Sequence, residues 1–168
     1  PNVSAIDLVA ISSGVTVERT RGGATTTLAS STGFNAVPQD TLRFYMPIQN
    51  RGLLPSPATT MNVESPDGSV QTAQVPSLPS LGQAIVEVNW TVPNAYPIGQ
   101  ISLSFQVDPN ESITDDGDRS NNNGVFSLWI GRLPVATLDM PAQSLTKSAV
   151  ILDASSSYDP DGLSLIHI

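Results

Sequence analysis

The segment from Ile101 to Asp108 constrains the fold more than any other, because apolar and polar side chains alternate along its whole length. Alternation with a period of two places successive side chains on opposite faces of a β-strand. The apolar face consists of Ile101, Leu103, Phe105 and Val107. The pattern therefore predicts a strand that covers a core with one face and meets solvent with the other.

A turn-rich connection follows this strand and leads to a second one. Residues 109–123 are rich in Asp, Asn and Ser, whose side chains hydrogen-bond nearby backbone and so favour turns. The chain returns as Gly124–Ile130, in which apolar residues fall on both faces. We expect a long β-hairpin whose second strand is central, with Trp129 packed inside the domain.

Similar alternation recurs along the chain at roughly ten-residue spacing, separated by turn signals. It is clearest in Leu42–Asn50 and in Ala84–Val92, where Trp90 falls in the inward set with three valines. Weaker candidates are residues 4–12, 15–18, 24–30, 58–64 and 70–75. No stretch has a helical pattern of any length. The chain is therefore expected to be all-β, an antiparallel β-sandwich of about seven strands.

Composition excludes several classes of function. The formal net charge of −8 repels phosphate backbones and anionic lipids, so neither nucleic-acid nor membrane partners are expected. No window is long and apolar enough to span a membrane. The chain has no cysteine and a single histidine, His167, which leaves no His/Cys zinc site and no catalytic triad that needs His or Cys. We expect no enzymatic activity.

A second module is expected after the hinge Arg132–Pro134. Val135–Asp139 and Ala149–Asp153 have the character of two further strands, but so short a segment buries too little area to form a core. The expected organisation is a β-sandwich over residues 1–131 and an incomplete β module over residues 132–162. The chain reads as a fragment of a longer protein.

Several motifs of the first module resemble CARDB, the cell-adhesion-related domain of bacterial and archaeal surface proteins. They are Asn50-Arg-Gly52, the strand bearing Trp90, the strand that ends in Val107-Asp108, and Asn121-Asn-Asn123. The resemblance covers about residues 3 to 131 and implies a seven-stranded immunoglobulin-like fold. The chain departs from the family at Asp115–Asp118, where an acidic residue followed by Asn-Glu is commoner, and in a longer insertion at Val15–Ala36.

Pro134-Val-Ala and Leu152–Gly162 resemble the first strands of a PKD domain, another immunoglobulin-like module of surface proteins. The strand bearing Trp, Phe and Gly-Asp-Gly that completes a PKD domain does not follow. The chain instead ends in Leu163–Ile168, which is similar to the translation of a common transposon-type sequencing adaptor. We interpret residues 163–168 as an artefact of a metagenomic read and draw no function from them.

The acidic loop holds the candidate metal ligands. Asp116, Asp118 and Ser120 place oxygen atoms at i, i+2 and i+4, as in a calcium loop, although the glycine and the bidentate glutamate of an EF-hand are missing. The alternative is a solvated loop whose side chains satisfy its own backbone. No other cofactor is expected. Tyr45 and Tyr96 are the best candidates for exposed aromatic side chains, and Trp90 is expected in the core.

The resemblance implies a non-enzymatic extracellular or cell-surface module that serves for adhesion or as a spacer in a multi-domain protein. Its partners would be neighbouring immunoglobulin-like domains of the same chain, and a surface protein or glycan. Two alternatives stay open. The module could be an accessory domain that presents a secreted hydrolase to its substrate, or a fibre subunit that pairs with a neighbour through an exposed edge strand.

Overall fold

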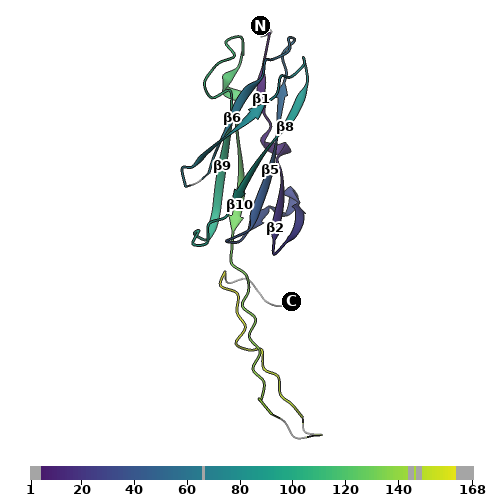
Figure 1. The fold of residues 1–168 in the computed structure, drawn as a ribbon, viewed down its shortest axis with the longest axis vertical. Coiled ribbons are helices and arrows are strands. Elements are labelled where there is room, and N and C mark those ends of the chain that lie inside the picture. The colour runs from purple at the N-terminus through teal and green to yellow at the C-terminus, as the bar shows by residue number, and fades with distance from the viewer. Residues whose placement is uncertain (1–4, 66, 144–145, 147–148, 162–168) are drawn as a thin grey trace. The chain divides into compact units, whose positions relative to one another are not determined.

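The computed structural model describes residues 5–65, 67–143, 146 and 149–161. The predicted adaptor segment Leu163–Ile168, with His167, lies outside them, as do Ser4 and Gly162. The chain divides into two units, Pro1–Ile130 and Gly131–Ile168. The first is a sandwich of two five-stranded sheets, as the alternating pattern predicts (Figure 1). Its strands are β1 (Leu8–Ala10), β2 (Thr16–Arg21), β3 (Ala24–Leu28), β4 (Phe34–Ala36), β5 (Thr41–Asn50), β6 (Thr59–Glu64), β7 (Val70–Val75), β8 (Gln83–Thr91), β9 (Gly99–Val107) and β10 (Asn123–Ile130).

The first sheet is organised around β5. One side of β5 pairs with β8 along its whole length, and the other side pairs with β2 and then with β1. Pro47 lies opposite the break between β1 and β2, where Ile11 N–H donates to the Pro47 carbonyl at 3.0 Å. A proline cannot donate to a ladder, so the position that has no N–H falls where the neighbouring strands are interrupted. β3 extends the sheet beyond β2.

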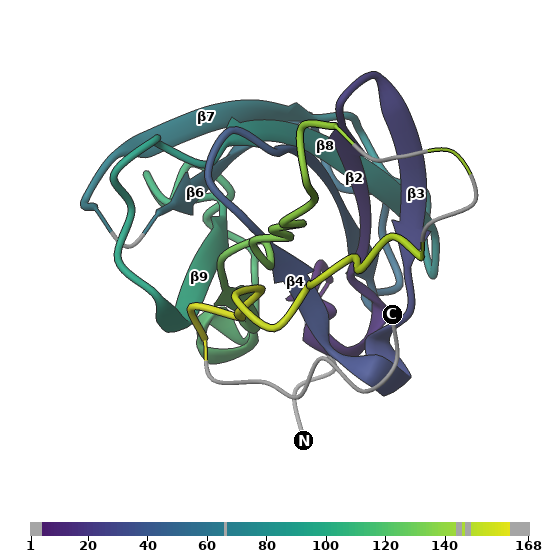
Figure 2. The same cartoon turned by 90° about the horizontal axis from the view of Figure 1, so that it is seen from below.

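The second sheet has the order β4-β10-β9-β6-β7. Figure 2, which looks along the sandwich, shows β6 and β9 on one side and β2 and β3 on the other. The long hairpin is present, with β9 and β10 paired antiparallel from Gln106↔Asn123 to Gly99↔Ile130. Within the described residues the fold has more than the expected seven strands. The short strand β4, which the sequence did not predict, pairs with β10 in parallel, so the sandwich is not purely antiparallel.

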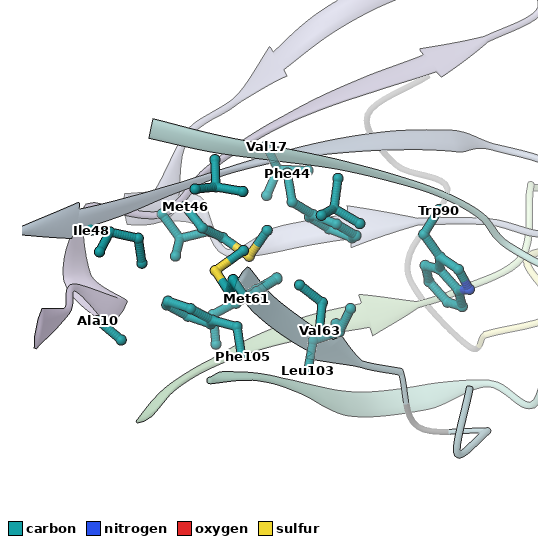
Figure 3. Close-up of a cluster of buried hydrophobic side chains, with 14 of the residues drawn as sticks. Ala10, Val17, Phe44, Met46, Ile48, Met61, Val63, Trp90, Leu103 and Phe105 are labelled. Carbon is teal, nitrogen blue, oxygen red and sulfur yellow. The ribbon is translucent and has the colours of Figure 1, made fainter. Parts of the chain in front are cut away.

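The core lies between the sheets and is built from the predicted inward sets. Phe44, Met46 and Ile48 of β5 face Phe105 and Met61 of the second sheet, with Trp90 toward one end (Figure 3). All of these except Trp90 are 0 or 1% exposed, and Trp90 is 6% exposed. Burial of large apolar side chains is the main stabilising contribution to a fold of this kind.

Two predictions about aromatic side chains are wrong. The side chains of β10 alternate, so Trp129 and Val125 lie on the solvent face and are 47% and 54% exposed. The strand is central in the sheet, but only one of its faces is covered. Tyr96, expected on the surface, is 9% exposed because its ring packs edge-on against Trp90, with centroids 5.5 Å apart. Tyr45 is half-buried, and its hydroxyl donates to Glu18 at 2.7 Å.

The described part of the second unit contains two isolated bridges, Val135↔Tyr158 and Asp139↔Asp153, in place of the continuous strands that were predicted. Each bridge is closed by two backbone hydrogen bonds of 2.7 to 3.0 Å. Leu138, Ile151 and Leu152 are exposed, because the described part of this unit has no second layer to cover them. Among the described residues, no helix has the length and apolar character that crossing a membrane requires.

Candidate functional site

The acidic loop after β9 begins at a buried aspartate. Asp108 is 2% exposed and has a φ of 50°, in the left-handed region that Asp tolerates better than most residues. Its Oδ1 accepts hydrogen bonds from the Thr59 hydroxyl at 2.8 Å, the Ser112 N–H at 3.0 Å and the Ser112 hydroxyl at 2.5 Å. Its Oδ2 accepts the Ile113 N–H at 2.9 Å. The carboxylate thereby fixes the first turn of the loop and ties it to β6.

This environment also sets the acidity of Asp108. Burial raises the pKa, but the hydrogen bonds from Ser112, Ile113 and Thr59 favour the ionised form and outweigh burial, which lowers the pKa to about 2. Arg119 lies 3.4 Å from Oδ2, and its other terminal nitrogen donates to the Ile113 carbonyl at 2.6 Å. The group is therefore a structural anchor that is ionised at neutral pH, without the raised pKa of a general acid.

The three predicted calcium ligands are held in two different ways. Asp118 Oδ1 accepts hydrogen bonds from the Ser120 N–H at 3.1 Å and from the Ser120 hydroxyl at 2.5 Å. It thereby caps the short 3₁₀ turn η3 (Arg119–Asn121). Asp116 is 8% exposed and faces β1, where Leu8 N–H donates to Oδ1 at 3.4 Å. Asn122 Nδ2 donates to its Oδ2 at 2.9 Å. Asp116 therefore belongs to the contact between loop and sandwich, and Asp118 to the loop itself.

In the described part of this loop, two amide oxygens are buried without a hydrogen-bond partner, the Oδ1 atoms of Asn121 and Asn122. Asn121 Nδ2 donates to Asp7 Oδ1 at 2.9 Å, so Asp7 lies at the same end of the sandwich. Within the described part of the chain, no three His, Cys, Asp or Glu side chains are close enough to share a metal ion. The calcium loop stays a prediction.

The Asn50-Arg-Gly52 motif is a second structural anchor. Asn50 is fully buried, and its Nδ2 donates to the carbonyls of Leu54 at 2.8 Å and Pro79 at 3.2 Å. Its Oδ1 accepts the Gly52 N–H at 3.0 Å. Gly52 packs directly on the backbone before β1, since an added Cβ would lie 2.5 Å from the Ile6 Cα. The hydrogen bonds therefore explain the asparagine of this motif, and the close approach of backbone explains the glycine.

Sequence reasoning missed the outer face of the second sheet, where Trp129 is exposed. The strand register shows how it could have been found. Phe126 pairs with the inward-facing Leu103, and Trp129 pairs with Gln100, so Trp129 lies on the face opposite to the apolar set of β9. An apolar residue on a strand does not by itself identify the buried face.

The first sheet carries a charged outer face. Glu18, Arg43 and Glu87 occupy neighbouring outward positions on β2, β5 and β8. The depression on this face, of about 150 Å³, contains one acid, Glu18, and so does not have the carboxyl pair of a glycoside hydrolase. The features described are therefore the outer faces of the two sheets and loops that buried polar side chains hold against the sandwich.

Comparisons with known proteins agree with the fold. The chain is similar to the CARDB domain of a Pyrococcus furiosus protein crystallised with di-metal ions, with 16% identity, a TM-score of 0.56, and coverage of 77% of this chain and 97% of that one. It is also similar to a domain of a predicted cell surface protein from Methanosarcina acetivorans, with 22% identity, a TM-score of 0.50, and coverage of 74% and 90%. Among curated proteins, none matches significantly. The CARDB family model matches residues 11–126, and the chain therefore belongs to the CARDB family.

Proposed function

We propose that this chain is a non-enzymatic, extracellular adhesion and spacer module of a multi-domain surface or secreted protein. The proposal rests on the role of the buried polar groups, which hold loops against the sandwich. Asp108, Asn50 and Asp116 each bind backbone groups that fasten a loop to the sandwich. A module whose polar groups hold its loops in place transmits position and force between its neighbours.

Another buried carboxylate supports the same proposal. Asp40 is 1% exposed and forms a bidentate pair with Arg21, at 2.8 and 2.7 Å. It also accepts the Val37 N–H at 2.8 Å. Burial raises the pKa of Asp40, but the bonds from Arg21 and Val37 outweigh it and leave the pKa below its usual value. This ion pair fixes the connection between β4 and β5.

The test is the location of the native protein. Antibodies raised against the chain should label intact cells of the source organism, or should detect the protein in the culture medium. The full reading frame should encode an export signal and further immunoglobulin-like modules. Labelling that requires broken cells would contradict the proposal.

The second unit supports the proposal that an incomplete PKD-like module follows the CARDB domain. The exposed Leu138, Ile151 and Leu152 are apolar side chains without a covering layer. A groove of about 570 Å³ within this unit is lined by Val135, Ala136 and Leu138, together with Pro134, Thr137, Ala154, Ser155 and Ser157. Both features are expected of part of a sandwich that has no second layer within the described residues.

We also retain the proposal of a weak calcium site in the acidic loop. The support is chemical. Carboxylate and amide oxygens are the ligands that Ca²⁺ prefers, and Asp116 binds the Nδ2 of Asn122, whose own buried Oδ1 lacks a partner. The similar CARDB domain from Pyrococcus furiosus was crystallised with di-metal ions. A bound cation would strengthen the attachment of the loop to β1.

A specific feature favours an accessory role beside a secreted hydrolase as a second candidate. Among the described outward residues of the second sheet, Glu64 is the one charged side chain, and Trp129 is exposed. A catalytic domain elsewhere in the full reading frame would support this candidate over a spacer alone.

A further inference from the structure

We propose that the outer face of the second sheet binds an uncharged polysaccharide, with Trp129 as the stacking platform. The inference deepens the proposed adhesion function, on which it rests, by assigning the surface and the class of ligand.

Trp129 lies in a row of paired residues on neighbouring strands. It pairs with Asn35 on β4 and with Gln100 on β9, so all three share the outer face. Arg19 binds the carbonyl and side-chain oxygens of Asn35, which fixes this amide beside the indole. A flat aromatic ring flanked by groups that both donate and accept hydrogen bonds matches a sugar ring, which has C–H groups on its faces and hydroxyls at its edge.

The rows that follow along the sheet have the same chemistry. The outward residues of the five strands are mostly amides and hydroxyls. They are Asn35, Thr60, Asn62, Glu64, Val70, Thr72, Gln74, Gln100, Ser102, Ser104, Gln106, Asn123, Val125, Ser127 and Trp129. Glu64 is the only charged side chain in this set.

The lack of charge on this face decides the class of ligand. The chain has a net charge of −8, and the outer face of the first sheet carries Glu18, Arg43 and Glu87. A neutral polyhydroxyl chain can cover the second sheet without desolvating many charges, which is costly unless they are paired. No residue of this set is basic, and Arg19, which reaches its edge from β2, is already bound to the oxygens of Asn35, so the face offers little to a nucleic acid or an acidic peptide. The surface thus complements an uncharged ligand.

The face is also long enough for an extended polysaccharide site and contains a depression. A depression of about 210 Å³ lies toward its other end, lined by Asn62, Ser104, Gln106 and Asn123 together with Glu64, Val70 and Phe105. Asn123 and Trp129 are six positions apart on β10, which corresponds to about 20 Å at the rise of a β-strand. The two features could therefore be spanned by several consecutive sugar rings of one chain.

The test is affinity electrophoresis of the whole chain through gels that contain one polysaccharide each. The neutral probes are hydroxyethylcellulose, xylan, galactomannan and mixed-linkage β-glucan, and the anionic probes are alginate and heparin. We expect retardation by at least one neutral probe and by neither anionic one. Trp129→Ala should weaken that binding at least tenfold, Trp129→Phe should retain most of it, and Gln100→Ala should weaken it less than Trp129→Ala.

Tyr45→Ala is the matched control, because it removes an aromatic side chain from the outer face of the other sheet. It should bind as the unmodified chain does, and circular dichroism should show that every variant is folded. The inference is overturned if no neutral probe retards the chain, if only an anionic probe does, or if Trp129→Ala and Tyr45→Ala behave alike. Surface labelling of the native protein is a separate readout, so a chain that is displayed but binds no polysaccharide would overturn this inference alone.

Discussion

Asp108 Oδ2 accepts the backbone N–H of Ile113 at 2.9 Å, so a charge fixed at the end of β9 holds the first turn of the acidic loop. The prediction is that Asp108→Asn lowers the free energy of unfolding at pH 7 by about 2 kcal/mol, the size of the pKa shift expressed as energy. Asn tolerates the left-handed φ at this position, so the loss reports the charge rather than backbone strain. Urea unfolding of both proteins measures it, with Asp115→Asn as an exposed control in the same loop.

The same residue predicts a pH dependence. The pKa of Asp108 is about 2 in the folded chain against an ordinary value of 3.8, so between these values the unfolded state binds more protons. The stabilisation is therefore complete above about pH 5 and is lost as the pH falls toward 2. The unfolding free energy of Asp108→Asn should vary less over this window than that of the unmodified chain. Parallel curves for the two proteins would show that the charge of Asp108 does not stabilise the fold.

Gly52→Ala should be strongly destabilising. The new methyl group would lie 2.5 Å from the Ile6 Cα and 2.6 Å from the Ala5 carbonyl oxygen, and backbone atoms cannot move aside as a flexible side chain can. We expect a loss of about 3 kcal/mol in the free energy of unfolding. Arg51→Ala changes the neighbouring exposed residue and should stay within about 0.5 kcal/mol of the unmodified chain. Thermal melts of both variants make the comparison, and equal stability would contradict the packing described for Gly52.

The two tryptophans should respond in opposite ways to substitution. Trp90 is 6% exposed and packs against Tyr96, so Trp90→Ala should cost about 3 kcal/mol or more. Trp129 is 47% exposed, and Trp129→Ala should change stability by no more than about 0.5 kcal/mol. Acrylamide should quench the fluorescence of the Trp90→Phe variant, which retains Trp129, more strongly than that of Trp129→Phe. Equal quenching would mean that Trp129 is covered in solution.

Millimolar Ca²⁺ should raise the melting temperature of the chain by a few degrees relative to EDTA, because a ligand that binds only the folded state stabilises it. Asp118→Asn should reduce this shift without lowering the melting temperature in EDTA appreciably, since Asp118 is exposed. Asp67→Asn, in the turn between β6 and β7, should leave the shift unchanged. An identical melting temperature in Ca²⁺ and EDTA would show that this loop does not bind calcium under these conditions.

The sequence predicted the sandwich and most of the core, because alternation identifies the inward set wherever one face of a strand is solvated. It predicted Phe44, Trp90 and Phe105 as buried, and all three are. It failed where apolar side chains occur on both faces, as at Trp129, because the polarity of a residue alone does not identify the covered face. It also failed for β4, since three residues are too few to show a period.

The candidate site was harder to predict for a related reason. In the sequence, the acidic residues of this loop are indistinguishable oxygen ligands. In the structure, Asp108 binds Thr59 of β6, Asp116 binds Leu8 of β1, and Asp118 binds within the loop itself. Which partner each carboxylate finds depends on contacts such as that of Asp116 with Leu8, which is distant in sequence. Local spacing carries no information about such contacts.

The parallel pairing of β4 with β10 has a consequence for biosynthesis. Phe34 and Leu128 meet although most of the domain separates them along the chain, and contacts of such long range slow folding. During synthesis, β4 has no pairing partner on this side until β10, which ends at Ile130, has emerged from the ribosome. Premature termination anywhere within β10 would therefore leave an incomplete chain with an unpaired strand edge, which is prone to aggregate. Export before folding would avoid such aggregation in the cytoplasm.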